Sequence, residues 1–524
     1  MRRILLILAL GGSVLALAPS AGAETLFVLS GRGWGHGVGM SQWGAFGLAE
    51  KGRSYKAILR RYYTDTAVQE RAGRNVRVEL ASGSTSLVVG SAGAFRVAAG
   101  TRKATHKAGE ATVTKTSRGR IRVAGLSGTF KSPATFKPKE APLRLGSTTY
   151  RGKLVVSVSG GRLRAVNRLG MDAYIQGVVP RESPSWWPPA ALQAQAVAAR
   201  SYALFALVRG GGKCGGAFCP DTRDQVYGGL SGEAGSTNAA VKATAREVVV
   251  DRGGNVAQTF FHSSSGGRTA DSRDIWGGDV SYLKSVSDPT DGVRENPNRR
   301  WRVVRTPGQL RSGLGLPCTP SDAALARDSS DRVGGIKACG MTADGGDSLR
   351  WELELKSNRF WLGVLRLNRS DGRIEWGRRV TLSALARGVK GSVLKRKPSG
   401  AGWDAMQPVN GAESVSKRPR VTTSYRLGPR AFGVTVRVKV EPRLRIRTVG
   451  ETSLSGTMRP RRAGTTISIQ RLSNGTWRPV ATTTLNADGA WKAKFPVGPG
   501  RYRAFAAPGQ GLAAGTSPAV RVAA

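Results

Sequence analysis

The chain has 524 residues and a formal net charge of +47, from 81 lysines and arginines against 34 acidic residues. A chain of this length holds roughly two to four domains. The basic residues are spread along it and favour polyanionic partners such as wall polymers or anionic lipid headgroups. Nucleic acid is not expected, because the sequence has no recognition helix, zinc-finger or aromatic RNA-binding motif.

The first 23 residues have the pattern of a secretory signal peptide. Arg2 and Arg3 precede an apolar run over residues 4–17, and residues 21–23 (Ala-Gly-Ala) offer a cleavage site. The run is short and broken by Gly and Ser, although an uncleaved anchor is the alternative. No cysteine follows closely enough for a lipoprotein anchor. We expect a secreted protein that acts outside the cell, at the cell wall.

Four cysteines are present: Cys214, Cys219, Cys318 and Cys339. An even number in an exported chain favours disulfides, and proximity favours the pairs Cys214–Cys219 and Cys318–Cys339. A zinc half-site at the first pair is the competing interpretation. The four residues between Cys214 and Cys219 carry no nitrogen or oxygen ligand, and the chain has only three histidines. We therefore expect disulfides and neither a metal nor another cofactor.

The N-terminal part of the mature chain is predicted to contain a strand, a loop and two helices. Residues 25–30 form the strand and residues 31–39 the glycine-rich loop. Ser41 caps a helix that ends near residue 51, and Ser54 caps a second helix that reaches residue 63. Residues 71–166 then change character, with short β-rich segments separated by Gly/Ser turns.

A long helix is predicted over residues 189–209, where Pro189 suits the first turn and glycines follow the end. An apolar strand and a loop precede it. A helix over residues 236–247 and strands at 248–250 and 256–261 follow.

The C-terminal third is predicted to be a linker and a β-sandwich. Residues 393–432 are rich in Lys, Arg, Pro, Gly and Ser, which is typical of a linker. Residues 433–524 alternate apolar and polar side chains between turn signals such as Asn474-Gly475, which indicates an immunoglobulin-like sandwich.

The expected fold class is therefore α+β: a mixed α/β catalytic domain with a β-rich insertion, followed by a C-terminal all-β immunoglobulin-like sandwich. The expected segments are the signal peptide 1–23, an N-terminal segment 24–70, a main domain 71–392, a basic linker 393–432 and a β-sandwich 433–524. The main domain divides into a β-rich part 71–166 and a catalytic core 167–392.

The glycine-rich loop continues through residues 31–44 and carries His36 between two glycines. Alternate glycines allow unusual backbone torsions and close approach of another chain. The loop is not a dinucleotide site, because His36 replaces the third glycine of that motif and no phosphate-loop Gly-Lys-Ser/Thr occurs. It is either a structural turn or a substrate-facing rim.

Glu182 is a candidate acid. It lies among prolines and the two tryptophans Trp186 and Trp187, in a loop before the long helix. Apolar neighbours raise the pKa of a carboxyl group toward the range that a general acid needs, and tryptophan faces suit sugar rings. The alternative is a solvated surface carboxylate. A third stretch, residues 258–269, lines a pocket or simply turns. The serine-hydrolase and zinc-protease signatures G-x-S-x-G and H-E-x-x-H are absent.

Together these stretches resemble the stage II sporulation protein D / LytB amidase-enhancer family. The matching strings are YIQGVVPRE (174–182), LQAQAVAARSY (192–202), Cys219 with QVY (225–227), SSSGG (263–267) and GHGVGMSQ (35–42). The resemblance covers roughly residues 31–380. The glycine–histidine string usually follows the SSSGG loop but here precedes it, so the order looks permuted. We expect residues 31–66 to fold back and complete the Glu182 pocket.

The resemblance implies a lytic transglycosylase. Such family members cut the MurNAc–GlcNAc β-1,4 bond of glycan strands stripped of stem peptides and leave a 1,6-anhydro-MurNAc end. Their catalytic acid falls on Glu182. Ordinary glycosidases need two carboxylates, whereas here the C6 hydroxyl of the sugar attacks and one residue serves as acid and then base.

The family position and helix geometry also suggest residues that bind substrate. These are Arg200, Gln195, His36, Gln42, Ser265 and Trp186. Some relatives bind zinc near the equivalent of Cys219, but the histidine of that cluster is missing here, so no metal is carried over.

A non-catalytic activator is the alternative, because amidase-enhancer members stimulate an enzyme that cuts wall peptides. The expected partners are peptidoglycan glycan strands and anionic wall polymers, with a cell-wall N-acetylmuramoyl-L-alanine amidase as the partner under this alternative. The family suggests a sporulation role, and growth or remodelling would require the same chemistry.

Overall fold

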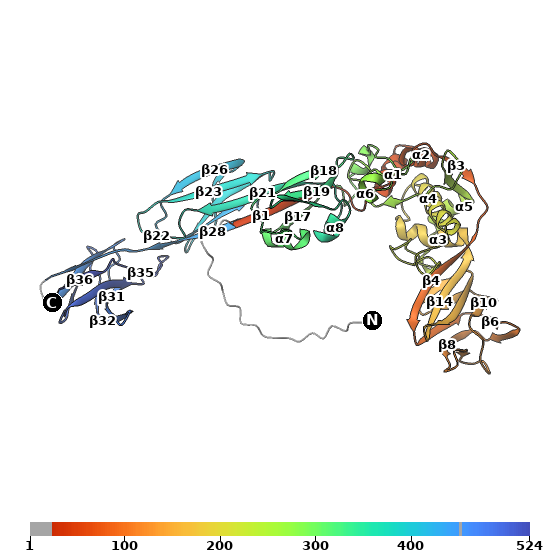
Figure 1. The fold of residues 1–524 in the computed structure, drawn as a ribbon, viewed down its shortest axis with the longest axis horizontal. Helices are drawn as coiled ribbons and strands as arrows, with labels where there is room; N and C mark the ends of the chain where they lie inside the picture. Colours follow the sequence, from red (N-terminus) through yellow and green to blue (C-terminus); the bar gives the residue numbers. More distant parts are fainter. Residues whose placement is uncertain (1–23, 450–452, 524) are drawn as a thin grey trace. The chain divides into compact units, whose positions relative to one another are not determined.

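The computed structural model describes residues 24–449 and 453–523, so the predicted signal peptide lies outside the described residues. The chain divides into two units (Figure 1). One, here named the cleft unit, contains residues 30–302 and 324–360. The other, the sandwich unit, combines residues 24–29 with residues 303–323, 361–449 and 453–523. Helices and many β-sheets are both present, so the chain contains both element types that an α+β fold requires.

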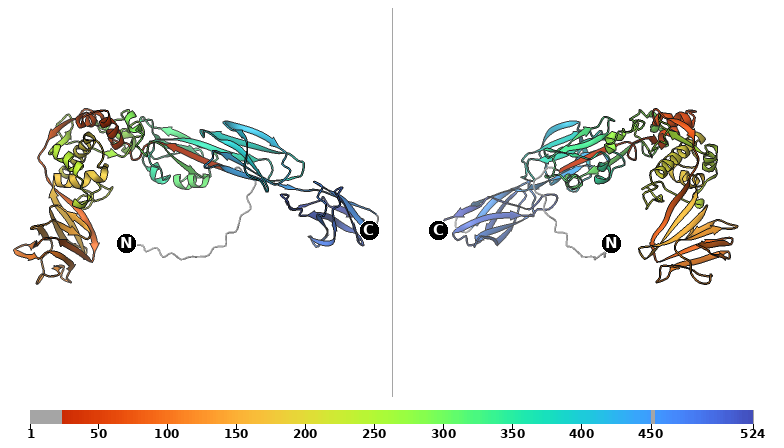
Figure 2. Two further views of the ribbon diagram at one scale, coloured as in Figure 1. Left: turned by 180° about the vertical axis from the view of Figure 1, so that it is seen from behind. Right: turned by 45° about the vertical axis from the view of Figure 1, so that its right-hand side comes forward.

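The β-rich part of the cleft unit consists of two sheets around one core, drawn in orange beyond the yellow helices α3 and α4 in Figures 1 and 2. The first sheet has the order β4 (Asn75–Ser84), β14 (Arg162–Gly170), β13 (Lys153–Ser159), β10 (Ala134–Pro138), β6 (Phe95–Ala99) and β7 (Arg102–His106). The second has the order β12 (Thr148–Tyr150), β11 (Leu143–Leu145), β5 (Ser86–Ser91), β8 (Gly109–Lys115) and β9 (Ile121–Val123).

The helices of the cleft unit gather around α4. They are α1 (Gln42–Glu50), α2 (Tyr55–Tyr62), α3 (Met171–Glu182), α4 (Pro189–Val208) and α5 (Gly235–Ala243), with the short α6 (Ser272–Trp276) and α8 (Ser348–Glu352). Helices α1, α2, α3 and α5 all contact α4. The N-caps are local: Ser41 accepts a hydrogen bond from Gly44 N, and Ser54 accepts one from Ala57 N.

Helix α4 is apolar on most of its surface because neighbouring helices surround it. It is long and apolar enough to cross a membrane by composition alone, yet 67% of its apolar window is buried inside the protein. Its many alanines allow the surrounding helices to approach closely. Helix α4 is therefore the central core helix of the cleft unit.

The N-terminal segment is paired with the middle of the chain. Strand β2 (Met40–Ser41) runs parallel to β16 (Phe261–His262), and β3 (Ala67–Glu70) runs antiparallel to β15 (Glu247–Val250). Only β16 forms within the strand predicted over residues 256–261. Residues 30–70 are thus built into the cleft unit, whereas the first residues of the predicted segment 24–70 form β1 (Glu24–Gly31) and belong to the sandwich unit.

Smaller elements complete the cleft unit. Strands β18 (Ala324–Arg327), β19 (Val333–Ala338) and β20 (Met341–Asp344) form a three-stranded sheet, and single 3-10 turns lie at η1 (Leu230–Gly232) and η2 (Pro289–Gly292).

The predicted strand and loop before the long helix are wrong: these residues form helix α3, and Glu182 is its last residue. The buried positions Tyr174, Ile175, Val178 and Val179 recur at helical spacing. A short apolar run with valines reads equally well as a strand, and Pro180 close to the end obscured the helical pattern.

The sandwich unit begins with a β-sandwich whose two sheets share one core. The first sheet has the order β17 (Trp301–Arg305), β1 (Glu24–Gly31), β21 (Phe360–Arg369), β23 (Val380–Arg387) and β26 (Gly411–Lys417). The second has the order β22 (Arg373–Glu375), β28 (Val434–Glu441), β27 (Thr423–Gly428), β24 (Val393–Pro398) and β25 (Asp404–Pro408). Helix α7 (Pro307–Leu314) belongs to the same unit.

The predicted basic linker over residues 393–432 is therefore wrong, since it contains strands β24 to β27. In β27, Thr423, Tyr425 and Leu427 are buried while the side chains between them are partly exposed. Basic residues occupy the outward positions of such strands, so the composition resembled a linker and masked the period of two. The catalytic core predicted to continue to residue 392 also gives way to this sandwich after Phe360.

The C-terminal sandwich begins at residue 443 rather than at 433, because β28 belongs to the preceding sandwich. Its first sheet has the order β29 (Arg443–Thr448), β30 (Ser453–Arg459) and β33 (Ala490–Lys494). The second contains β32 (Thr476–Thr484), β31 (Thr466–Ser473), β34 (Gly500–Ala506) and β35 (Gly515–Thr516), with β36 (Val520–Val522) also paired to β34. Buried side chains of both sheets form one core.

Candidate active site

The end of α3 and the glycine-rich loop meet in a cleft of about 510 Å3 within the cleft unit. Glu182, His36 and Gln42 all line it, although Glu182 is far from the other two in sequence. Loop residues 33–35 also bond to distant backbone: Trp34 exchanges hydrogen bonds with Ser264. The N-terminal segment thus folds back onto the cleft that contains Glu182.

Alternate glycines are needed for this close approach. Gly35 and Gly39 adopt φ values of +115° and +71°, in the region that glycine favours. A Cβ on Gly39 would lie 2.1 Å from Phe260 O, and one on Gly35 would lie 2.8 Å from His262 Cβ. The glycines therefore let the loop lie directly against the chain around β16.

Glu182 is a partly buried carboxyl group with few hydrogen bonds. Its Oε1 accepts from Val226 N at 3.1 Å, and the Gln42 side chain also hydrogen-bonds to it. Burial raises the pKa of Glu182, and these two donors oppose the rise because they stabilise the charged form. A carboxyl group with a raised pKa can hold a proton for transfer to substrate.

Gln195 positions Gln42 from below the cleft surface. The Gln42 Nε2 donates to Gln195 Oε1 at 3.4 Å, and both side chains are buried. Gln195 does not line the cleft. It contacts Gln42 beneath the cleft surface, which corrects its assignment as a substrate-binding residue.

Two histidines line the cleft, and their ring nitrogens make different hydrogen bonds. His36 Nδ1 accepts from Val38 N at 3.1 Å, its ring also hydrogen-bonds to the Phe261 backbone, and burial lowers its pKa to about 4. His262 Nδ1 lies 3.1 Å from Val38 O, which only accepts, so Nδ1 carries the proton. His262 Nε2 has no partner among the residues that the structure describes. His262, which the sequence analysis did not select, thus has the available lone pair.

The walls of the cleft are aromatic. Trp34, Trp276 and Trp351 line it and are 49%, 45% and 73% exposed, which is unusual for such large apolar side chains. Tyr202 and Phe260 are further lining residues. Flat, exposed aromatic faces suit sugar rings. These tryptophans lie far apart in sequence, so no local motif identified them.

Two other carboxylates line the cleft, so Glu182 is not alone there as the sequence suggested. Asp224 Oδ2 accepts from the backbone N–H groups of Lys213 and Cys219 at 3.0 and 2.8 Å. Asp347 pairs with Arg350 at 2.8 Å. Both groups thus already accept hydrogen bonds or an ion pair within the protein. Burial raises the pKa of Glu182.

The Cys214–Cys219 disulfide closes the loop that precedes Asp224. Cys318 and Cys339 are also disulfide-bonded. Within residues 24–449 and 453–523, no three His, Cys, Asp or Glu side chains are arranged to hold a metal ion.

Arg200 does not line the cleft, which corrects its assignment as a substrate-binding residue. Its guanidinium is 2% exposed and bonds to Asp172 Oδ1, Glu247 O and Val241 O. It joins α3, α5 and β15 around the central helix. The helical spacing placed Arg200 on the wrong side of α4, because the face of a buried helix cannot be assigned when all faces are apolar.

Ser265 and Trp186 also lie outside the cleft lining. Trp186 is 63% exposed and packs against Trp43 and Phe46. Ser265 is fully buried, and its Oγ donates to Asp288 Oδ2 at 2.8 Å. Buried carboxyl groups therefore hold the loop around Ser265, and the Ser265 hydroxyl does not face the cleft.

Asp288 gives this loop a pH-dependent stability. Burial and the neighbouring Asp291 raise the pKa of Asp288 to about 6, above the value in an unfolded chain, so folding favours the protonated form. The free energy of unfolding of the wild type, relative to Asp288→Asn, should fall by about 3 kcal/mol as pH rises from about 4 to about 6. Urea unfolding of both proteins across this range measures the difference. A difference that is constant with pH would contradict the assignment.

Comparison with known proteins finds a family model that is similar to the helical core. Residues 159–250 match the family model SpoIID, described as stage II sporulation protein. This stretch contains α3, α4 and α5, and therefore Glu182, but not the glycine-rich loop.

Curated relatives agree with this match. An uncharacterized protein of Brachyspira hyodysenteriae is 33% identical over 187 residues, 36% of this chain and 50% of the relative. The amidase enhancer of Bacillus subtilis is 34% identical over 167 residues, 31% of this chain and 21% of the relative. Stage II sporulation protein D of Bacillus subtilis is 27% identical over 197 residues, 35% of this chain and 57% of the relative. The chain thus spans less than two thirds of each.

Among solved structures, a two-domain fibronectin type III segment of chicken tenascin covers 30% of this chain, with 15% identity and a TM-score of 0.20. A score this low supports no conclusion about the sandwiches. Residues 159–250 are thus similar to the SpoIID family model, and the chain is similar in part to stage II sporulation protein D and to the amidase enhancer.

Proposed function

We propose that the protein is an exported lytic transglycosylase of the cell wall. It cleaves the MurNAc–GlcNAc β-1,4 bond of peptidoglycan strands and leaves a 1,6-anhydro-MurNAc end. The observation that carries the proposal is Glu182, a carboxyl group with a raised pKa in an aromatic cleft. The signal-peptide pattern and the net charge of +47 support export and attraction to an anionic wall.

The chemistry needs one carboxyl group. Protonated Glu182 gives its proton to the glycosidic oxygen as the bond from C1 to that oxygen breaks. The C6 hydroxyl of the same MurNAc forms the new bond to C1, and its proton returns to the Glu182 carboxylate. No water is consumed. Asp224 and Asp347 are already hydrogen-bonded or ion-paired within the protein, which favours this route over a two-carboxylate hydrolysis.

Product mass tests the proposal. Purified glycan strands without stem peptides are incubated with the mature protein, and the ends are analysed by mass spectrometry. Ends lighter than hydrolytic ends by one water molecule support intramolecular attack. Hydrolytic ends would instead indicate a second carboxylate that activates water, and Asp224→Asn would then test that role.

Replacing Gln42 with methionine should move the pH profile upward. The Gln42 amide stabilises the charged form of Glu182 and so lowers its pKa. In Gln42→Met this donor is absent, the pKa of Glu182 rises further, and the active protonated form persists to higher pH. The alkaline limb of kcat/KM against pH should therefore shift to higher pH. Gln69→Met, at an exposed position of β3, is the matched control. If the alkaline limb stays in place or moves to lower pH, the Gln42 side chain does not stabilise the charged form of Glu182.

A second candidate is an activator of a wall amidase. It is favoured by the 34% identity of one region to a protein named amidase enhancer. Under this function the cleft binds glycan without cutting it, and a partner amidase releases stem peptides. Amidase assays on intact wall, with and without the protein, decide between the two: stimulated peptide release without new glycan ends supports the activator.

A further inference from the structure

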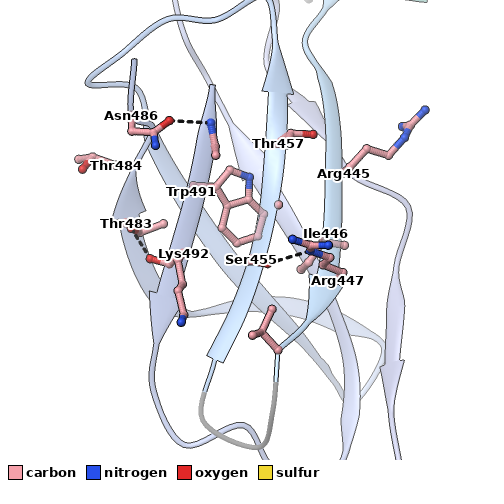
Figure 3. Close-up of a pocket in the computed structure, with 13 residues that line it drawn as sticks. Arg445, Ile446, Arg447, Ser455, Thr457, Thr483, Thr484, Asn486, Trp491 and Lys492 are labelled. Carbon is pink, nitrogen blue, oxygen red and sulfur yellow. Dashed lines mark hydrogen bonds between the residues drawn. The ribbon is translucent and has the colours of Figure 1, made fainter. Parts of the chain in front are cut away.

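The C-terminal sandwich has a pocket of about 700 Å3 that is distinct from the cleft (Figure 3). It lies over the sheet of β29, β30 and β33 and near the end of β32. Arg445 and Arg447 lie on one side, Thr483, Thr484 and Asn486 lie on the opposite side, and Trp491 lies between them. Its size is that of a small-ligand site.

The strand register builds a polar row across this sheet. Arg447 pairs with Ser455 across β29 and β30, and Ser455 pairs with Lys492 across β30 and β33. Directly opposed residues point to the same face, so these three side chains form one row. The neighbouring row contains Arg445 and Thr457. Three cations and several hydroxyl groups therefore share one concave surface.

The floor of the pocket depends on Gly456. Gly456 pairs with Trp491, and a Cβ on it would lie 2.4 Å from Trp491 Cζ2. The indole therefore packs against β30 at this position. The side chain is 4% exposed and its Nε1 has no partner among the described residues. The ring belongs to the core of the sandwich, supports the pocket floor from the core side and is not an open platform for stacking bases.

The electrostatics point to an anionic ligand. No carboxylate is among the lining residues. Arg447 Nε donates to the Ser455 hydroxyl at 3.3 Å, and neither Arg447 nor Lys492 is paired with a carboxylate in the part of the chain that the structure describes. Arg445 makes a partly exposed ion pair with Glu375 at 3.6 Å. Two cations are thus available to a ligand, with hydroxyl and amide groups around them.

We propose that this pocket binds a segment of an anionic saccharide polymer, one that carries carboxylate or phosphate groups. Arg447 and Lys492 contact the anionic groups, and Thr457, Thr483 and Thr484 contact sugar hydroxyls. The pocket anchors the enzyme to the wall through a module outside the SpoIID match. The proposal rests on the proposed function only in placing the protein at the wall, because binding here does not require cleavage.

Binding is measured with the mature chain carrying Glu182→Gln, so that cleavage cannot alter the probe. The probes are polygalacturonate, phosphomannan, neutral dextran, single-stranded oligothymidylate and vesicles of phosphatidylglycerol and phosphatidylcholine. Titration calorimetry at two salt concentrations gives the affinities. The first two probes distinguish carboxylate from phosphate as the anionic group, and tighter binding to either than to the other three supports the proposal.

Variants localise the binding. Arg447→Gln with Lys492→Gln should weaken binding to the preferred polymer about ten-fold or more. Arg478→Gln with Lys494→Gln removes the same charge from exposed strand positions of the same sandwich outside the pocket and should change affinity less than about three-fold. Thr457→Trp fills the pocket at an exposed position without changing charge and should also weaken binding.

Three results would overturn the proposal. Equal losses of affinity in both double variants would mean that the ligand is attracted by diffuse charge. Unaltered binding by Thr457→Trp would show that the ligand does not occupy the pocket. Tighter binding to the oligonucleotide or the vesicles would assign another class of ligand. Because cleavage is absent from every arm, failure here leaves the product-mass test of the cleft independent.

Discussion

Glycan cleavage should fall about 10³-fold when Glu182 is replaced with glutamine, within the range that general acids contribute. Glutamine has the same shape, and its oxygen can still accept the hydrogen bond from Val226 N. It cannot, however, donate a proton to the glycosidic oxygen at any pH. The rate of appearance of new glycan ends, followed by chromatography and mass spectrometry, measures the effect.

The control for this variant is Glu50→Gln, at the exposed last residue of α1, which should cleave at the wild-type rate. Circular dichroism and thermal unfolding should be unchanged in both variants. If Glu182→Gln cleaves normally, Glu182 is not the acid. If the wild type does not cleave and both variants stimulate an amidase equally, the activator function is favoured.

Replacing Asp291 with alanine should destabilise the cleft unit by about 4 kcal/mol. Asp291 is 1% exposed. Its Oδ1 accepts from Ser41 Oγ at 2.8 Å and Ser265 N at 3.0 Å, and its Oδ2 accepts from Ser264 Oγ at 2.8 Å and Gly266 N at 2.9 Å. Alanine leaves four buried donors without this acceptor, and each unsatisfied group is costly.

Differential scanning calorimetry measures this effect as a fall of about 6 °C in the Tm of the cleft unit. Asp221→Ala, which removes an exposed ion pair with Arg223, should change that Tm by less than about 3 °C. A similar Tm for Asp291→Ala and the wild type would show that the loop is held by other contacts.

Much of the local structure could be predicted from the sequence. Ser41 and Ser54 are N-caps as expected from their position before helical segments, and Pro189 begins α4. These signals are local, since a cap or a first-turn proline acts within one turn of the helix. Two assignments are wrong. The apolar run of α3 is compatible with either a strand or a helix, and the basic composition of residues 393–432 is compatible with either a linker or exposed strand positions.

Residues of the site could be predicted only where they belong to a recognisable sequence motif. Glu182, His36 and Gln42 belong to strings that resemble a family, and the structure brings all three to one cleft. Arg200 belongs to the same strings but stabilises the core. Trp276 reaches the cleft by tertiary folding, for which no sequence spacing exists. His262 lies in the stretch 258–269, and the pairing of β2 with β16 and its contact with Val38 O place it beside the loop.

The position of β1 governs when the protein can finish folding. Strand β1, the first element of the described chain, lies between β17 and β21 in its sheet, so both of its edges are occupied by residues made much later. During synthesis, one edge of this strand therefore stays unpaired in its sheet until β21 has been made. A chain truncated before residue 360 would expose β1 as an open edge and be prone to aggregation. Completion of the chain through β21 is thus a precondition for a stable product.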